Sequence, residues 1–173
     1  VGPGNLFVTI AKRKLFGVVG IEGLHGPTET LIIADETADP EVCAADLLAQ
    51  AEHDWLSTPV LLTTSKELSL SVPEALKRQL TSLDRANIAS SAMENQGVLA
   101  LVPTIEDAID LANDFAPEHL CLLVDNPGRY LDQVRNAGGI FIGESSCEVL
   151  GDYNAGPSHV MPTGGTARFT SAL

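Results

Sequence analysis

The chain has 173 residues, of which 45% are hydrophobic and 19% charged, and its formal net charge is −13. This composition indicates a globular chain that can bury a core as one domain or as two small ones. The acidic balance argues against a nucleic-acid partner, because phosphates are bound by basic surfaces. No apolar run approaches the roughly 18 residues of a membrane span and no signal segment opens the chain, so we expect no membrane partner.

The cysteines indicate a reduced environment. Cys43, Cys121 and Cys147 are widely separated, odd in number and include no Cys-x-x-Cys pair. Cys43 lies in a helical pattern and Cys121 in an apolar strand pattern, which favours small buried hydrophobic side chains. Cys147 stands between acidic residues, a setting that argues against a nucleophilic thiolate. We therefore expect the protein to be cytoplasmic.

Hydrophobic periodicity predicts strands that alternate with helices along most of the chain. The predicted strands cover residues 30–34, 59–63, 98–102, 118–124 and 140–142. The predicted helices cover residues 6–16, 40 to about 54, 65–93 with an interruption at Val72-Pro73, 104–115, and a short segment between 126 and 138. Turns are predicted at 2–5 and 26–29, and a long loop from Gly143 onward.

Helix starts are marked by capping residues. Asp39-Pro40 is typical of an N-cap followed by a first helical residue, and Thr104 with Asp107 is typical of a capping box. The alternation of strand and helix predicts the α/β class with a parallel sheet.

The pattern restarts at Ala116-Pro117, which suggests a division of the chain. We expect two partial, incomplete Rossmann-like parallel-sheet domains, one inserted in the other. Residues 1–28 and 116–173 would belong to one domain, and residues 29–115 to the inserted one. The chain starts at Val1 without a methionine and stops at Leu173 without an obvious closing element, so we expect a piece of a longer protein.

Gln50 and His53 are the first candidate functional pair. They stand three residues apart near the end of the helix that begins at Pro40, so their side chains share one face. An imidazole beside an amide oxygen is half of a plausible metal site and needs ligands from elsewhere. A pair of this kind is more often an ordinary surface or helix-end pair, and spacing alone favours that alternative.

Glu118 and His119 are the second candidate pair. They follow a proline at the start of a predicted strand, and a carboxylate beside an imidazole suits general acid–base chemistry. The alternative is a surface carboxylate next to a histidine that caps the strand.

The glycine-rich segment after residue 150 contains three further candidates. Asp152 is either a turn former or a hard oxygen ligand that would join Gln50 and His53 around zinc. His159 is either a histidine at the edge of the core or a substrate contact. Residues 164–168 offer backbone amides and the Arg168 guanidinium, compatible with an anionic group or with a flexible tail.

Read together, these stretches resemble histidinol dehydrogenase. The matching segments are, in chain order, 2–5 (GPGN), 26–29 (GPTE) with 32–35 (IIAD), 45–54 (ADLLAQAEHD), Asn113 with 116–120 (APEHL), and 151–168. The resemblance spans essentially the whole chain, and it is the order and spacing of the blocks together that make it specific.

The resemblance implies a reaction and its residues. The family oxidises L-histidinol to L-histidine through the aldehyde level, with zinc and NAD, as the last steps of histidine biosynthesis. Three zinc ligands are implied at Gln50, His53 and Asp152, residues that also contact substrate. Glu118 and His119 are implied as the acid–base pair, with His119 also at the substrate. The remaining implied contacts are Thr28 and His159 for the substrate and Asn5 for NAD.

Two departures from the family pattern define the alternatives. Residues 20–25 differ from the usual run, which suggests a paralogue that oxidises another amino or sulfonated alcohol. A fourth zinc ligand, a histidine near the family's C-terminus, has no counterpart before Leu173. Much of the family's NAD-binding half would lie upstream of Val1. The family's homodimer completes each site with that terminal segment, so we expect the isolated chain to be inactive. A non-catalytic binding or assembly domain is the other alternative.

Overall fold

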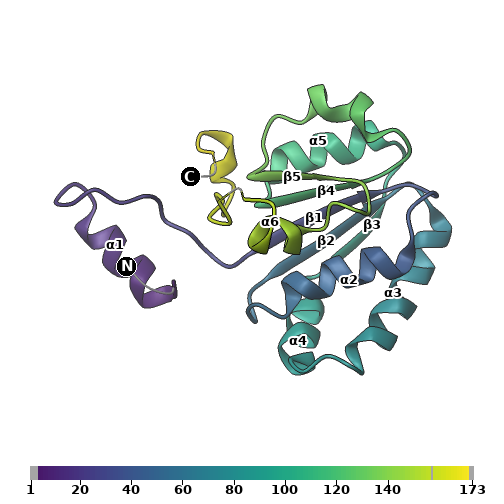
Figure 1. Cartoon of the computed structure of the whole chain (residues 1–173), viewed down its shortest axis with the longest axis horizontal. Helices are drawn as coiled ribbons and strands as arrows, with labels where there is room; N and C mark the ends of the chain where they lie inside the picture. Colours follow the sequence, from purple (N-terminus) through teal and green to yellow (C-terminus); the bar gives the residue numbers. More distant parts are fainter. Residues whose placement is uncertain (1–3, 157, 172–173) are drawn as a thin grey trace.

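A computed structural model describes residues 4–156 and 158–171 of the chain. Gly2 and Pro3 of the predicted turn at 2–5, and Pro157 of the predicted loop, lie outside the described residues. The centre of the fold is a parallel sheet of five strands in the order β3-β2-β1-β4-β5 (Figure 1). The strands are β1 Glu29–Ala34, β2 Thr58–Thr63, β3 Val98–Leu101, β4 His119–Leu123 and β5 Gly139–Ile142.

Helices cover both faces of this sheet. The α-helices are α1 Leu6–Leu15, α2 Pro40–Ala51, α3 Lys66–Leu80, α4 Ala86–Gln96, α5 Ile105–Phe115 and α6 Glu148–Tyr153, and the 3₁₀ helices are η1 Pro127–Gln133 and η2 Thr166–Arg168. The α/β class with a parallel sheet is therefore confirmed. In the described part of the chain, no helix combines the length and the apolar character that crossing a membrane requires.

Side-chain alternation along the central strands divides the core into two layers. Leu31, Ile33 and Leu122 pack on the side of α5, whereas Ile32 and Cys121 pack on the side of α2 and α3. Parallel strands that are covered on both faces need apolar residues at successive positions, which explains the unbroken hydrophobic runs in β1 and β4.

The predicted helix starts are confirmed. The Asp39 side chain accepts a hydrogen bond from the Glu41 backbone amide at 2.8 Å, with Pro40 as the first helical residue of α2. Oγ1 of Thr104 accepts one from the Asp107 amide at 3.1 Å and donates to its carboxylate at 2.7 Å. Both devices satisfy backbone amides that have no partner inside the helix.

Two predicted element boundaries are wrong. The expected interruption at Val72-Pro73 does not occur, because α3 continues through Pro73 and the helical pattern breaks at residues 81–85 instead. Leu68, Val72 and Ala75 are buried at helical spacing, and this packing stabilises the helix despite the hydrogen bond that Pro73 cannot donate. The segment after Gly143 is also not a continuous loop, since it contains α6.

Strands from both sides of the predicted division near Ala116 belong to one sheet. β1 and β4 pair in parallel, with Thr30 opposite His119 and Ile32 opposite Cys121. This corrects the expectation that residues 116–173 build a different sheet from residues 29–115. Ala116 has φ 56° and ends α5 in the left-handed region, which turns the chain directly into β4. Periodicity identifies a strand but not the neighbour with which it pairs, and the assignment of residues 1–28 to another domain stays a prediction.

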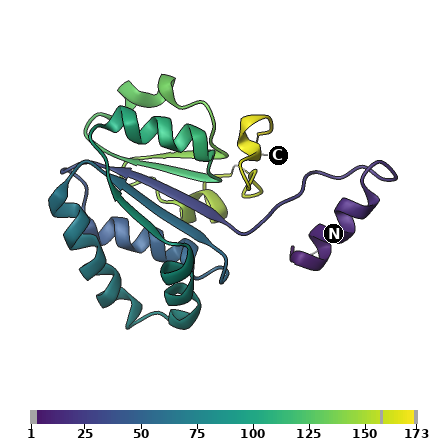
Figure 2. The same ribbon diagram turned by 180° about the vertical axis from the view of Figure 1, so that it is seen from behind.

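Helix α1 lies apart from the sheet and is joined to it by an extended segment (Figures 1 and 2). None of its residues is buried. Its side-chain contacts with the following segment include a Lys12–Glu22 ion pair and a hydrogen bond from the Thr9 hydroxyl to the His25 carbonyl at 3.1 Å. These contacts place α1 beside the candidate site.

Candidate functional site

The candidate site lies at the edge of the sheet where the central strands begin. Thr28 directly precedes β1, Glu118 directly precedes β4, and α2 ends near the same edge before the chain enters β2. Ligands of open α/β sheets more often bind at the carboxyl ends of the strands. In this chain, α6 lies against β1 and β4, where Glu148 contacts Thr30 and Cys121. Asp152 in the same helix is near enough to act on the pKa values of Glu118 and His119.

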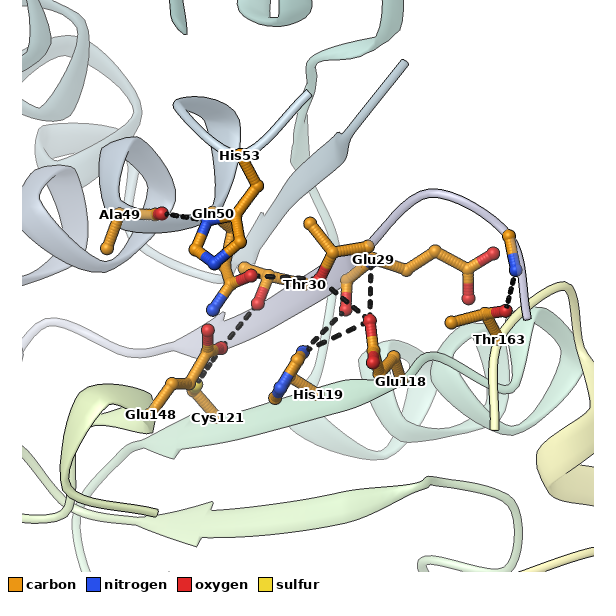
Figure 3. Close-up of polar contacts among 12 residues, drawn as sticks. Glu29, Thr30, Ala49, Gln50, His53, Glu118, His119, Cys121, Glu148 and Thr163 are labelled. Carbon is orange, nitrogen blue, oxygen red and sulfur yellow. Dashed lines mark hydrogen bonds and ion pairs between the residues drawn. The ribbon is translucent and has the colours of Figure 1, made fainter. Parts of the chain in front are cut away.

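Glu118 is held by groups from β1 and the residue before it. Its Oε2 lies 2.7 Å from the Thr28 hydroxyl and 3.3 Å from the Glu29 backbone amide (Figure 3). The same Thr28 oxygen lies 2.8 Å from Oε1 of Gln50. A hydroxyl has one hydrogen to donate, so Thr28 donates to Gln50 when Glu118 is protonated and can donate to Glu118 when that carboxyl is ionised.

Burial raises the pKa of the Glu118 carboxyl to about 7, and the nearby Glu29 and Asp152 carboxylates also raise it. The hydrogen bonds from Thr28 and the Glu29 amide act in the opposite direction, because they favour the ionised form. A carboxyl that titrates near neutral pH can both take up and release a proton, as a general base requires.

His119 is 4% exposed and lies beside Glu118. Burial lowers its pKa, so the neutral imidazole is the prevailing form at neutral pH. Its Nδ1 lies 3.2 Å from the Glu29 carbonyl and 3.6 Å from Oε2 of Glu118. Because a carbonyl can only accept, we assign the proton to Nδ1, which leaves Nε2 with a lone pair that can accept a proton.

Gln50 and His53 are close to this pair, because the Thr28 hydroxyl contacts both Gln50 and Glu118, and His53 is near enough to act on His119. Gln50 is 3% exposed, whereas His53 is exposed. Nδ1 of His53 lies 2.7 Å from the Ala49 carbonyl, so by the same reasoning Nε2 is free to act as a ligand. Histidines that bind metals commonly donate their other ring nitrogen to a carbonyl in this way.

Asp152 lies in α6 and approaches the same groups. Its charge raises the pKa of both Glu118 and His119, and His53 lowers that of His119, so all four side chains are electrostatically coupled. Among the described residues, no group of three or more His, Cys, Asp or Glu side chains is arranged to hold a metal. The predicted zinc ligands are not a set of that kind, because they comprise His53, Asp152 and the amide of Gln50.

A cavity of about 890 Å³ opens beside Glu118. Thr28, Glu118 and His159 line it, together with Lys12, Glu22 and His25 from the segment around α1. His159 is exposed, and the structure brings it to the cavity but gives it no role of its own.

Asn5 lies at a neighbouring cavity of about 490 Å³, which Thr28 and His53 also line. Its side-chain oxygen accepts a hydrogen bond from the Val8 amide at 3.0 Å and so caps α1. The Asn5 oxygen is therefore already used, and a role toward NAD stays a prediction.

Glu148 is a buried acid that sequence analysis missed. It is 1% exposed at the start of α6, and burial raises its pKa to about 7. In the sequence, Glu148 is simply an acidic residue before a short apolar run. The same pattern occurs in the first turn of ordinary helices, so it does not indicate a buried acid. The burial depends on the return of α6 to the sheet, which local sequence does not specify.

The chain matches one family of known proteins over its whole length. A family model described as histidinol dehydrogenase matches residues 1–173. The chain is 57% identical to a histidinol dehydrogenase of Deinococcus radiodurans over 99% of its length and 56% identical to one of Thermus thermophilus over 100%. It covers 40% and 42% of those relatives. The crystal structure of histidinol dehydrogenase from Elizabethkingia anophelis superposes with a TM-score of 0.96 at 44% identity, covering 99% of this chain and 40% of that one.

Proposed function

Because the chain belongs to the histidinol dehydrogenase family, we propose that it carries acid–base and metal-binding residues of an enzyme that oxidises L-histidinol to L-histidine. The chain spans about two fifths of the length of the relatives it matches, so this activity is proposed for the protein of which it forms part. The observation that carries the proposal is the hydrogen-bonded chain Glu118–Thr28–Gln50 beside the neutral His119.

Gln50, His53 and Asp152 are the residues that would hold zinc. The fit rests on the Ala49 carbonyl, which fixes the His53 tautomer with Nε2 free, and on the Gln50 oxygen, which is a suitable neutral donor. When bound, the metal would orient the amine and imidazole of the substrate.

His119 and Glu118 divide the proton transfers. Nε2 of His119 accepts the proton of the substrate hydroxyl, which an alcohol must lose on its way to the aldehyde level. NAD, when bound, would supply the acceptor for the hydride that leaves the same carbon. While Glu118 is ionised, the Thr28 hydroxyl donates a hydrogen bond to its carboxylate. Glu118 then accepts a proton from the water that attacks the aldehyde carbon. A pKa of about 7 for Glu118 suits this role, because a base works best when its pKa lies near the operating pH.

The described residues do not fit a complete NAD site. The loops that follow β1, β2, β3 and β4 contain no glycine before the next helix, whereas a dinucleotide-binding turn needs several. Asn5 is the single NAD contact that we propose for this chain, and we derive no step through the cofactor.

Zinc binding by the 173-residue chain tests the proposal. Isothermal calorimetry should detect zinc binding that weakens at least tenfold in each of the variants Gln50→Ala, His53→Ala and Asp152→Ala. His159→Ala is the matched control, because it removes an imidazole from the same cavity and should leave the affinity unchanged. Affinities that are equal in the wild type and the three ligand variants would contradict the proposal.

A second candidate function is oxidation of a different amino or sulfonated alcohol. Glu22 and His25, which line the cavity, come from the segment where the sequence departs from the family pattern. Calorimetric titration of the zinc-loaded chain with L-histidinol and with other amino alcohols separates the two candidates. Preferential binding of L-histidinol supports the first.

The homodimer expected for the whole protein is also a proposal. Light scattering of the chain and of a full-length relative would show whether residues outside this chain are needed for dimerisation.

A further inference from the structure

Glu148 is a buried carboxyl that the proposed reaction does not use. Its Oε1 accepts a hydrogen bond from the Thr30 hydroxyl in β1 and lies 3.1 Å from Sγ of Cys121 in β4. Its Oε2 is buried and makes no hydrogen bond of standard geometry. A buried acid with one oxygen unsatisfied lowers stability, so its position calls for a physical reason.

Gln50 also faces this carboxyl. Figure 3 shows the Gln50 amide nitrogen pointing toward the Glu148 carboxyl. The amide oxygen of Gln50 instead lies 2.8 Å from the Thr28 hydroxyl, at the candidate site. The Glu148 carboxyl, whose Oε2 has no hydrogen-bond partner among the described residues, therefore offers an acceptor at the nitrogen end of the Gln50 amide.

The two ends of a glutamine amide have nearly the same shape but opposite hydrogen-bonding roles. The oxygen accepts and can bind a metal ion, whereas the nitrogen only donates. An ionised carboxylate only accepts, so a carboxylate next to one end of the amide fixes that end as the nitrogen. The oxygen must then face the other way, toward Thr28 and the cavity.

We propose that Glu148 is a positioning residue that orients the Gln50 amide so that Oε1 is presented to the metal. This inference rests on the proposed function, in which Gln50 is a zinc ligand. Thr30 and Cys121 hold Glu148 from two adjacent strands, so the orientation is set by the sheet and not by the flexible Gln50 side chain. Partners that hold metal ligands in this way typically contribute 10- to 100-fold to metal affinity.

The substitution Glu148→Gln tests this role with almost no change in shape. The oxygen of the new amide can still accept from Thr30 and Cys121, so its NH₂ group faces the NH₂ group of Gln50. Two donors in contact repel, and rotation of the Gln50 amide by 180° relieves the conflict. That rotation points nitrogen instead of oxygen at the metal.

We expect zinc affinity at pH 8 to fall 10- to 100-fold in Glu148→Gln, measured by calorimetry on the 173-residue chain. Asp46→Asn is the matched control. Asp46 is also a buried acid, and it lies in α2 one helical turn before Gln50. In our proposal its substitution removes a charge but leaves the orientation of the Gln50 amide unchanged. The control should keep its affinity within about twofold. Equal losses in both variants would overturn the inference, because charge alone would then explain them.

A measurement without metal separates this inference from the proposed function. The side-chain NH₂ resonance of Gln50, identified by its absence in Gln50→Ala, should exchange slowly with water in the wild type and faster in Glu148→Gln. Free exchange in the wild type would overturn the positioning role, whether or not the variant folds. If exchange is slow but the wild type binds no zinc, then zinc ligation by Gln50 fails, while the orientation of its amide by Glu148 stands.

Discussion

The substitution Glu118→Gln should change the pH dependence of stability by an amount that follows from the structure. Burial raises the pKa of Glu118 to about 7, from an ordinary value of 4.5. The folded protein therefore binds this proton more tightly than the unfolded chain, and its stability falls as the pH rises from 4.5 to about 7. Glutamine has nearly the same shape and no such proton, so the variant avoids this loss.

The size of the effect follows from the two pKa values. The buried carboxyl lowers the free energy of unfolding by about 1.4 kcal/mol at pH 5.5 and by about 3.4 kcal/mol at pH 8.5, at about 1.36 kcal/mol per pKa unit. The variant should thus gain about 2 kcal/mol relative to the wild type between these two pH values. The comparison of two pH values cancels the pH-independent cost of altered hydrogen bonds to Thr28 and the Glu29 amide.

Urea unfolding followed by circular dichroism at pH 5.5 and pH 8.5 measures this difference. Glu106→Gln on α5 is the control, because Glu106 is exposed and its substitution should change the free energy of unfolding by less than about 0.5 kcal/mol at either pH. If the stability difference between Glu118→Gln and the wild type is the same at both pH values, the reasoning about Glu118 is refuted.

Two further predictions concern the neighbour of Glu118 and the core. Thr28→Val removes a hydroxyl that favours the ionised form of Glu118, so the pKa of Glu118 should rise further. A ¹³C NMR titration of the Glu118 carboxyl measures this pKa, and a lower value than in the wild type would contradict the assigned hydrogen bond. Leu122→Ala deletes a fully buried side chain between the sheet and α5 and should lower the free energy of unfolding by about 2–5 kcal/mol in urea. A loss below 1 kcal/mol would mean that the packing around β4 collapses to fill the space.

The elements of the fold were predictable because their signals are local. Unbroken apolar runs mark β1 and β4, and Asp39 and Thr104 cap the helices that the sequence assigns to them. The continuation of α3 through Pro73 was not predictable, because the burial of its apolar face against α2 and the sheet outweighs the local effect of proline.

The candidate site divides in the same way. Gln50 with His53, and Glu118 with His119, were recognisable as pairs because each pair is adjacent or one turn apart in the sequence. Sequence alone could not show that Thr28 joins Glu118 to Gln50, because that contact bridges residues 22 and 90 positions apart.

The sequence by itself determined the α/β class, the residue types of the candidate site and the family to which the chain belongs. Only the tertiary structure decided the strand order, which places β1 between β2 and β4 and brings Glu118 to Thr28. It also decided the path of α6, which buries Glu148 against Thr30 and Cys121. The physical reason is that periodicity and capping report the local environment of a residue, whereas pKa values and hydrogen-bond partners depend on segments that meet only after folding.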